Sequence, residues 1–385
     1  MVEYMENKVL KPKIRFKGFT DTWEQRKLND VYTFSQGMQV EIENQAFDKK
    51  DNMEQFLRII DITQSNEPPR YIYNKSGKGH VEKDDIFFVR YGAVGTIGYG
   101  YTGTIANNLF KLSTSEKYDN NFMFQQFSNG NFNKKLVEMS ASTSMPAINF
   151  TALKNLDFFI TTNDEQKEIG SFFSKLDNLI TLHQSKYDKL VNVKKALLEK
   201  MFPKEGKNVP EIRFKGFTDT WEQRKLGEIY KFQYGEFNNN PSNGGIYPVY
   251  GANGIIGGYT NYNAENSVII GHMGEYAGSV LWGNGKHFVT YNGTISKPKG
   301  ENVASKFGYY MLYQKDINKI CGGSGLPFLS YEQLNKIEVC YPKDIKEQKS
   351  IANYLTNIDN LITLHQHKLE KLQNIKKSLL NKMFV

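Results

Sequence analysis

Only two cysteines, Cys321 and Cys340, occur among the 385 residues, and no apolar run is long enough to cross a membrane. Two cysteines cannot form the disulfide framework of a small secreted protein, which favours a reducing compartment. A transmembrane helix needs roughly 18 or more consecutive apolar residues, and residues 1–16 lack the apolar core of a secretory signal peptide. These absences predict a soluble cytoplasmic protein that does not act at a membrane.

Motifs of nucleotide chemistry are also missing. A phosphate-binding GxxxxGK[ST] loop is absent, because the GK at 285–286 is followed by histidine. No [DN]PP[YF] motif of amino-methyltransferases occurs, and the EPPR at 67–70 is typical of a turn. Gly92, Gly95 and Gly98 lie among β-branched and aromatic residues, so turns are favoured over a nucleotide-binding fingerprint. We therefore predict no catalytic residues in this chain.

What the sequence contains instead is a long segment that occurs twice, at 165–202 and 347–384, with DNLITLHQ at 177–184 and 359–366. Apolar residues recur at alternating steps of three and four, which predicts amphipathic helices with a seam narrow enough for a coiled coil. The first seam comprises Leu176, Ile180, His183, Tyr187, Leu190, Leu197 and Met201, and the second comprises Ile358, Ile362, His365, Leu369, Leu372, Leu379 and Met383. Each helix would be roughly 55 Å long and would pack best against its own copy.

Metal-ligand spacing is absent among the six histidines and two cysteines. His183 and His365 occupy matching positions on the two seams, where a buried, hydrogen-bonded structural role is favoured over a ligand or a base. We predict no metal site and no cofactor held by this chain itself.

A second repeat, IRFKGFTDTWEQRKL, is identical at 14–28 and 212–226. One order therefore occurs twice: short motif, variable stretch, long helix. The variable stretches share little identity and contain short β-branched or aromatic runs separated by Gly and Asn turns. Strands are expected at 86–90, 156–160, 268–270, 286–289 and 337–341, and short helices at 121–128 and 304–314.

We predict an α+β fold with two mixed α/β domains separated by two long antiparallel coiled-coil helices, arranged as a pseudo-two-fold internal repeat. The predicted segments are 1–160 for the first domain, 161–204 for the first long helix, 205–342 for the second domain and 343–385 for the second long helix.

The net charge of +8 suggests an anionic partner, but it is unevenly distributed. Residues 29–160 and 227–342 carry net charges of −2 and 0, whereas the repeated segments carry +10. If DNA is the ligand, much of the attraction for phosphate lies on the repeated segments, and the variable domains contribute local contacts.

The paired IRFKGFTDTWEQRKL motifs, the Gly-rich variable stretches and the two DNLITLHQ helices resemble the specificity subunit of type I restriction-modification enzymes over essentially the whole chain. The resemblance implies that each variable domain is a target recognition domain, which reads one half of a bipartite, asymmetric double-stranded DNA sequence. It also implies that the helices set the spacer and dock two methyltransferase subunits, to which two nuclease/translocase subunits are added for restriction of phage DNA. S-adenosylmethionine, ATP and Mg²⁺ would belong to these partner subunits.

Base readout requires donors and acceptors on loops, with Arg or Lys suited to guanine and Asn or Gln to adenine. The alternative for each candidate is an ordinary role in a turn or at a half-buried sheet position. The candidates for DNA contact are Arg90, Tyr91, Asn107, Asn108, Lys111 and Ser144 in the first domain, and His272, Tyr276, Lys286, Tyr291, Asn292, Lys297 and Ser324 in the second.

Two further sets recur at matching positions on the repeats. The lysine pairs form a solvated face or neutralise phosphates over the unread spacer; they are Lys194 and Lys195 with Lys376 and Lys377. The aromatic residues pack against the adjoining domain or dock a methyltransferase subunit; they are Phe16, Phe19 and Trp23 with Phe214, Phe217 and Trp221.

Two alternatives compete with this interpretation. A structural or adhesive coiled-coil protein could use its Tyr- and Asn-rich domains to bind glycans or another protein, and salt-dependent DNA binding would discriminate against it. A self-contained nuclease would cleave DNA with Mg²⁺ alone.

Overall fold

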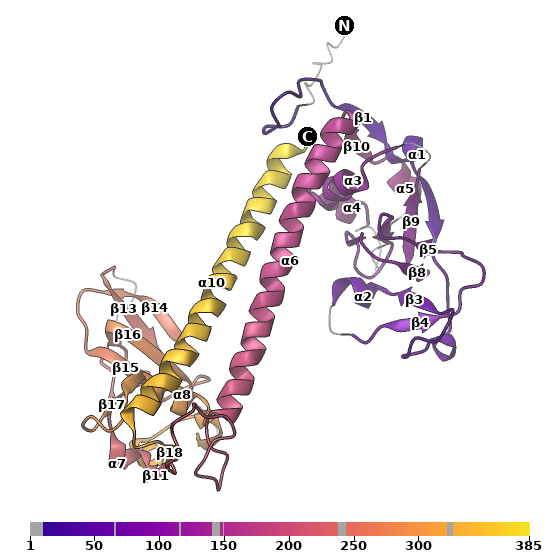
Figure 1. The fold of residues 1–385 in the computed structure, drawn as a ribbon. Coiled ribbons are helices and arrows are strands. Elements are labelled where there is room, and N and C mark those ends of the chain that lie inside the picture. Colours follow the sequence, from indigo (N-terminus) through magenta and orange to yellow (C-terminus); the bar gives the residue numbers. More distant parts are fainter. Residues whose placement is uncertain are drawn as a thin grey trace. The chain divides into compact units, whose positions relative to one another are not determined.

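The computed structural model describes residues 11–64, 67–114, 117–140, 147–148, 150–237, 244–321 and 326–385. The chain divides into two compact units: unit 1 comprises Met1–His183 with Lys368–Val385, and unit 2 comprises Gln184–His367 (Figure 1). Each unit contains one variable domain and a part of each long helix. Among the described residues, no helix combines the length and apolar character needed to span a membrane.

The two long repeats form the helices α6 (Asn163–Lys200) and α10 (Ile345–Met383) (Figure 1). Within each unit, the α6 and α10 segments pack against each other in antiparallel directions. Every residue of the two predicted seams is buried or half-buried, as expected of a stripe that faces the partner helix. Each helix begins with a first-turn glutamate, Glu165 or Glu347, which suits the positive end of the helix dipole.

Unit 1 has an antiparallel pair, β1 (Glu24–Lys27) with β10 (Asp157–Ile160), and two four-stranded sheets. The first sheet has the order β2 (Thr33–Gln36), β9 (Leu109–Ser113), β6 (Ile86–Val89) and β7 (Ile97–Gly98). The second has the order β4 (Arg70–Ile72), β3 (Glu54–Leu57), β8 (Gly103–Ile105) and β5 (His80–Val81). The helices are α1 (Leu28–Val31), α2 (Ile59–Thr63), α3 (Asn120–Ser128), α4 (Gly130–Ser140), α5 (Phe150–Lys154) and a 3-10 turn at Ile42–Asn44.

Unit 2 repeats the antiparallel pair as β11 (Glu222–Lys225) with β18 (Glu338–Tyr341). Its six-stranded sheet has the order β12 (Tyr230–Tyr234), β17 (Gly293–Pro298), β15 (Ala264–Gly271), β16 (Val280–Val289), β13 (Tyr247–Gly251) and β14 (Gly254–Tyr259). The helices are α7 (Leu226–Ile229), α8 (Ser305–Tyr313), α9 (Tyr331–Lys336) and a 3-10 turn at Ile317–Ile320.

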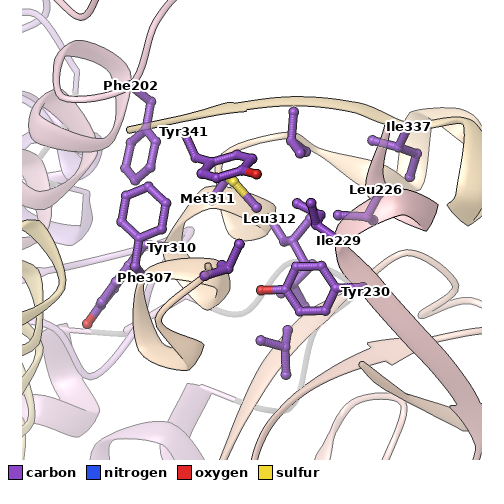
Figure 2. Packing of buried hydrophobic residues seen from close by; sticks show 14 of the residues in the cluster. Phe202, Leu226, Ile229, Tyr230, Phe307, Tyr310, Met311, Leu312, Ile337 and Tyr341 are labelled. Atoms are coloured by element: carbon purple, nitrogen blue, oxygen red, sulfur yellow. The ribbon is translucent and has the colours of Figure 1, made fainter. Parts of the chain in front are cut away.

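The core of unit 2 lies where α8 meets the end of α6 and the β11–β18 pair (Figure 2). The rings of Phe307 and Phe202 lie 5.7 Å apart, and Tyr310 and Tyr341 are buried beside them. The Tyr310 hydroxyl donates to Asp359 Oδ2 at 2.6 Å, and burial raises the pKa of this phenol. A helix of the variable domain is thereby attached to α10.

These elements confirm the predicted α+β class. The expected strands at 86–90, 268–270 and 286–289 correspond to β6, β15 and the end of β16, and the expected helices to α3 and α8. The predicted segment boundaries stay predictions. The two compact units divide each long helix between them, rather than separating the helices from the domains.

Candidate nucleic-acid interface

An identical short motif attaches each variable domain to one long helix. In unit 1, the Arg15 guanidinium donates to both carboxylate oxygens of Glu165, at 2.5 and 2.7 Å. In unit 2, Arg213 makes the same contacts with Glu347, at 2.6 and 2.8 Å. The two carboxylates are 0% and 1% exposed, respectively. Their hydrogen bonds raise the pKa of both guanidinium groups, so both arginines stay charged.

The two tryptophans of this motif point into the cores. Trp23 lies edge-on to Phe384 with ring centroids 5.9 Å apart, and Trp221 lies edge-on to Phe202 at 6.0 Å. Each tryptophan is only 2% exposed. The expectation that they dock a partner subunit is therefore wrong, because they have almost no surface to offer. Packing against the adjoining domain explains their presence in both copies.

The phenylalanines of the motif are half-buried. Phe16 packs edge-on against Phe172, and Phe214 against Tyr354, both with ring centroids 5.8 Å apart. These contacts attach the motif to α6 in unit 1 and to α10 in unit 2. A docking role stays a prediction for Phe16, Phe19, Phe214 and Phe217.

One lysine of each pair belongs to the contact between the long helices. In unit 2, Lys194 Nζ lies 2.7 Å from Asp359 Oδ1. In unit 1, Lys376 Nζ lies 2.6 Å from Asp177 Oδ1. The two lysine side chains are only 17% and 22% exposed. These amines are neutralised within the helix pair, which contradicts their predicted role in binding phosphate.

The neighbouring lysines, Lys195 and Lys377, are exposed. They lie one helical position further on, about 100° around the helix axis, and so point away from the partner helix. The prediction of phosphate contact over the spacer is therefore restricted to these two residues, and for them it stays a prediction.

The variable domains share a strand arrangement despite their low sequence identity. In unit 1, β9 lies between β2 and β6, and all neighbours are antiparallel. In unit 2, β17 lies in the same way between β12 and β15. Beyond the strand ends, the same backbone hydrogen bonds recur. We call this arrangement the strand-end frame; it contains Gln36, Gly37, Arg90, Asn107 and Asn108 in unit 1, and Tyr234, Gly235, His272, Tyr291 and Asn292 in unit 2.

In unit 1, Arg90 is held at the end of β6 by two backbone hydrogen bonds. Its N–H donates to the Asn108 carbonyl at 2.8 Å, and its carbonyl accepts from Ile148 N–H at 2.7 Å. The Gly37 N–H donates to the Leu109 carbonyl at 3.0 Å. A side chain at this glycine would meet the carbonyl oxygens of 105 and 106 at 2.2 and 2.3 Å, so the close crossing requires glycine.

In unit 2, the same contacts surround His272 at the end of β15. Its N–H donates to the Asn292 carbonyl at 3.1 Å, and its carbonyl accepts from Leu329 N–H at 2.8 Å. The Gly235 N–H donates to the Gly293 carbonyl at 2.8 Å. A side chain at Gly235 would again meet two carbonyl oxygens, those of 290 and 289, at 2.2 and 2.3 Å.

Polar side chains occupy the frame of unit 1. Gln36 Nε2 donates to the Asn107 carbonyl at 2.6 Å, and Asn107 Nδ2 donates to Gln39 Oε1 at 3.1 Å. The Arg90 guanidinium lies 5.0 Å from the centre of the Phe150 ring. Among the described residues, its buried Nε has no hydrogen-bond partner.

Two other candidates of unit 1 differ in their surroundings. Tyr91 is half-buried and forms a β-bridge with Ala147. Lys111 Nζ lies 2.5 Å from Asp85 Oδ2 and donates to the His80 carbonyl at 3.3 Å. Since Lys111 already has a carboxylate partner and is largely covered, the structure does not support its direct contact with DNA.

Aromatic side chains occupy the frame of unit 2. The His272 ring is stacked on Tyr234 at 4.4 Å, and Tyr234 is stacked on Tyr331 at 4.1 Å. Tyr291 and Phe328 lie edge-on to His272 at 5.2 and 5.7 Å. His272 is fully buried, and among the described residues neither ring nitrogen has a partner. The expectation that its side chain touches DNA is wrong for this conformation.

The accessible groups of this frame are the rings that cover His272. Tyr291 is 47% exposed and Phe328 is 41% exposed. Burial lowers the pKa of His272, so the imidazole is neutral at pH 7. The surface above it therefore presents uncharged aromatic rings.

The remaining candidates of unit 2 are exposed. Tyr276 is 41% exposed. Asn292 is exposed on the loop before β17, and Lys297 is exposed on β17 itself. The Lys286 amine lies 4.6 Å from the centre of the Tyr262 ring. DNA contact stays a prediction for these residues. Ser144 and Ser324 lie outside the described residues.

Sequence reasoning missed Gln36 and Tyr234, which precede the equivalent glycines of the frame. The sequence did contain a signal for this pair, because Gln36 and Tyr234 are 198 positions apart. The two short motifs are separated by the same offset. It also missed exposed leucines within the repeated DNLITLHQ segment. Leu179 and Leu182 are 46% and 47% exposed, and Leu361 and Leu364 are 43% and 46% exposed.

Known proteins share this organisation. A family profile described as type I restriction modification DNA specificity domain matches residues 20–192 and 218–374. The type I restriction enzyme MjaVIII specificity subunit of Methanocaldococcus jannaschii is 23% identical over 347 residues, which cover 78% of this chain and 78% of that protein. The crystal structure of a type I restriction-modification system S subunit from M. genitalium has a TM-score of 0.77 at 19% identity, over 97% of this chain and 99% of the other. The fold is therefore shared at low sequence identity.

Proposed function

The chain belongs to the type I restriction modification DNA specificity family, whose members are DNA-recognition components, and we propose that each variable domain reads one half of a bipartite, asymmetric target. The strand-end frame is the observation that carries this proposal. One backbone arrangement holds Arg90 and Asn107 in unit 1 but His272 and Tyr291 in unit 2. A constant frame with different side chains suits one chain that reads two different sequences.

The long helices set the distance between the two half-sites. A helix rises about 1.5 Å per residue, so the length of α6 and α10 fixes the number of base pairs left unread. The Lys194–Asp359 and Lys376–Asp177 pairs hold the register of the helices within each unit. Methyl transfer, ATP use and DNA cleavage belong to partner subunits, which bring S-adenosylmethionine, ATP and Mg²⁺.

Two methyltransferase subunits dock on the exposed leucines of the long helices. Leu179 and Leu182 lie three positions apart on α6, and Leu361 and Leu364 occupy the same places on α10. Residues three apart share a helix face, so each pair forms one apolar patch. Two identical patches suit two identical partners, since burial of leucine drives association.

Replacing both leucines of one patch with glutamine should remove one methyltransferase subunit from the complex. Each buried leucine contributes about 1.5–3 kcal/mol, so the doubly substituted patch should bind its subunit at least about 100-fold more weakly. Native mass spectrometry of the L179Q/L182Q and L361Q/L364Q variants measures the stoichiometry. The matched control is the T181Q/T363Q variant, because both threonines are exposed on the same helices. Two bound subunits in every variant would place the docking surface elsewhere.

Exchange of the first variable domain is expected to change one half of the target and leave the other half intact. The chain is expressed with its cognate methyltransferase subunit in a methylation-free host, and methylated adenines are mapped at base resolution. The domain is then replaced by its counterpart from another specificity subunit. A split motif with a constant gap, of which one half changes, supports the proposal. An unchanged motif, or methylation without a split motif, contradicts it.

A further inference from the structure

We propose that the strand-end frame is the half-site reading position of both domains, and that unit 1 reads purine edges there whereas unit 2 contacts thymine methyl groups. This inference rests on the proposed function and assigns the chemistry of each half-site.

The two frames correspond position by position, although the offset in sequence changes along the chain. Gly37 and Gly235 are 198 positions apart, whereas Arg90 and His272 are 182 positions apart. Matching backbone hydrogen bonds establish the correspondence where sequence alignment would not. The corresponding side chains, unit 1 first, are Gln36 and Tyr234, Arg90 and His272, Asn107 and Tyr291, and Asn108 and Asn292.

In unit 1, the frame combines a guanidinium with side-chain amides. Among the described residues, the Arg90 guanidinium has no carboxylate partner. It lies against the Phe150 ring. Gln36 is exposed, and Arg90, Asn107 and Asn108 are half-buried, so part of each side chain is accessible. Arginine pairs with guanine O6 and N7, and asparagine or glutamine pairs with adenine N6 and N7, so purine edges suit the polar groups that this frame offers.

In unit 2, every corresponding side chain except Asn292 is an uncharged ring. Tyr291 and Phe328 are exposed above His272, and the buried imidazole cannot reach a base edge without displacing them. The thymine methyl is the only apolar group in the major groove, and aromatic side chains contact it. An aromatic surface at the same frame position therefore selects thymine by apolar contact.

The test removes single functional groups from the bases of the mapped target. Deoxyuridine lacks only the thymine methyl, and 7-deazapurines lack only the N7 acceptor. Affinity of the complete methyltransferase complex is measured by fluorescence anisotropy, with each half-site assigned by the domain exchange. In the half-site of unit 2, deoxyuridine should weaken binding about fourfold per methyl. In the half-site of unit 1, one 7-deazapurine should weaken binding about tenfold. Deoxyuridine in the half-site of unit 1 and 7-deazapurine in the half-site of unit 2 should have little effect on affinity.

Variants connect these effects to the frame. Y291A should bind thymine and deoxyuridine targets equally, and R90Q should bind purine and 7-deazapurine targets equally. The K315Q variant is the control, because Lys315 is exposed and lies outside the frame; it should retain both sensitivities. Circular dichroism and the stoichiometry of the complex establish that each variant is folded.

Three outcomes overturn the inference: no A·T pair in the half-site of unit 2, no loss of affinity on substitution of deoxyuridine, or a deoxyuridine effect that persists in Y291A. Each of these presupposes a split, sequence-specific target. Failure of the proposed function is distinguishable, because no split target would then exist and no half-site could be assigned.

Discussion

Replacing Arg213 with methionine is expected to lower the free energy of unfolding of unit 2 by about 3–5 kcal/mol. The substitution removes both guanidinium hydrogen bonds from Glu347, a carboxylate that is 1% exposed. Trp221 Nε1 still donates to Glu347 Oε1 at 3.3 Å, but a neutral indole cannot neutralise a charge. The large loss arises because an uncompensated buried charge remains. Arg15→Met should destabilise unit 1 in the same way, because Glu165 is 0% exposed.

The measurement is native-state hydrogen exchange, because a chain with two units does not unfold in one transition. The amides of β11 and β18 report on unit 2, and those of β1 and β10 on unit 1. Arg224→Met is the matched control: its side chain is 48% exposed and pairs with Glu222 at the surface, where water screens the pair, so its loss should change protection far less. Equal effects of R213M and R224M would show that the buried pair does not hold the unit together.

A second control separates the missing charge partner from the missing side chain. When both members of a buried ion pair become apolar, the protein often recovers its stability. The R213M/E347M variant should therefore be more stable than R213M alone. If the double variant is less stable, the packing of the arginine stem rather than the unpaired carboxylate accounts for the loss.

The long helices could be predicted because their period is carried by many residues. Even so, the position of one lysine in each pair was not recognised. Lys194 lies between Leu190 and Leu197 at the step of four that continues the seam, and Lys376 lies in the same place on α10. The period thus placed both lysines on the contact stripe, but their charge suggested a solvated face. Their acidic partners, Asp359 and Asp177, could not be identified because the contact joins distant segments.

The candidate DNA residues were only partly predictable. Arg90, Asn107 and Tyr291 lie in the strand-end frame, as expected from their position next to strands and turns. His272 does not reach the surface, because Phe328, 56 positions away in sequence, helps to cover it. Whether a loop side chain is exposed depends on such distant contacts, and a local pattern carries no information about them.

The glycines of the frame are expected to tolerate no side chain. Gly37→Ala or Gly235→Ala would place a Cβ within 2.3 Å of two backbone carbonyl oxygens, and neither strand can move without breaking the hydrogen bonds at its end. Overpacking of this kind costs about 1–3 kcal/mol, and more where backbone must shift. Each substitution should also abolish recognition of one half-site, because it displaces the residues that the frame holds.

Methylation mapping and hydrogen exchange measure the two consequences together. Gly130→Ala is the control for unit 1, since nothing lies within 4 Å of its added Cβ, and Gly251→Ala is the control for unit 2, where the nearest atom is a side-chain carbon at 3.4 Å. G37A should relax the half-site of unit 1 only, and G235A that of unit 2 only. If both substitutions leave the methylated motif intact, the crossing of the strands is not what positions the reading residues. Loss of one half-site with protection of the other unit unchanged would locate each reading function in its own frame.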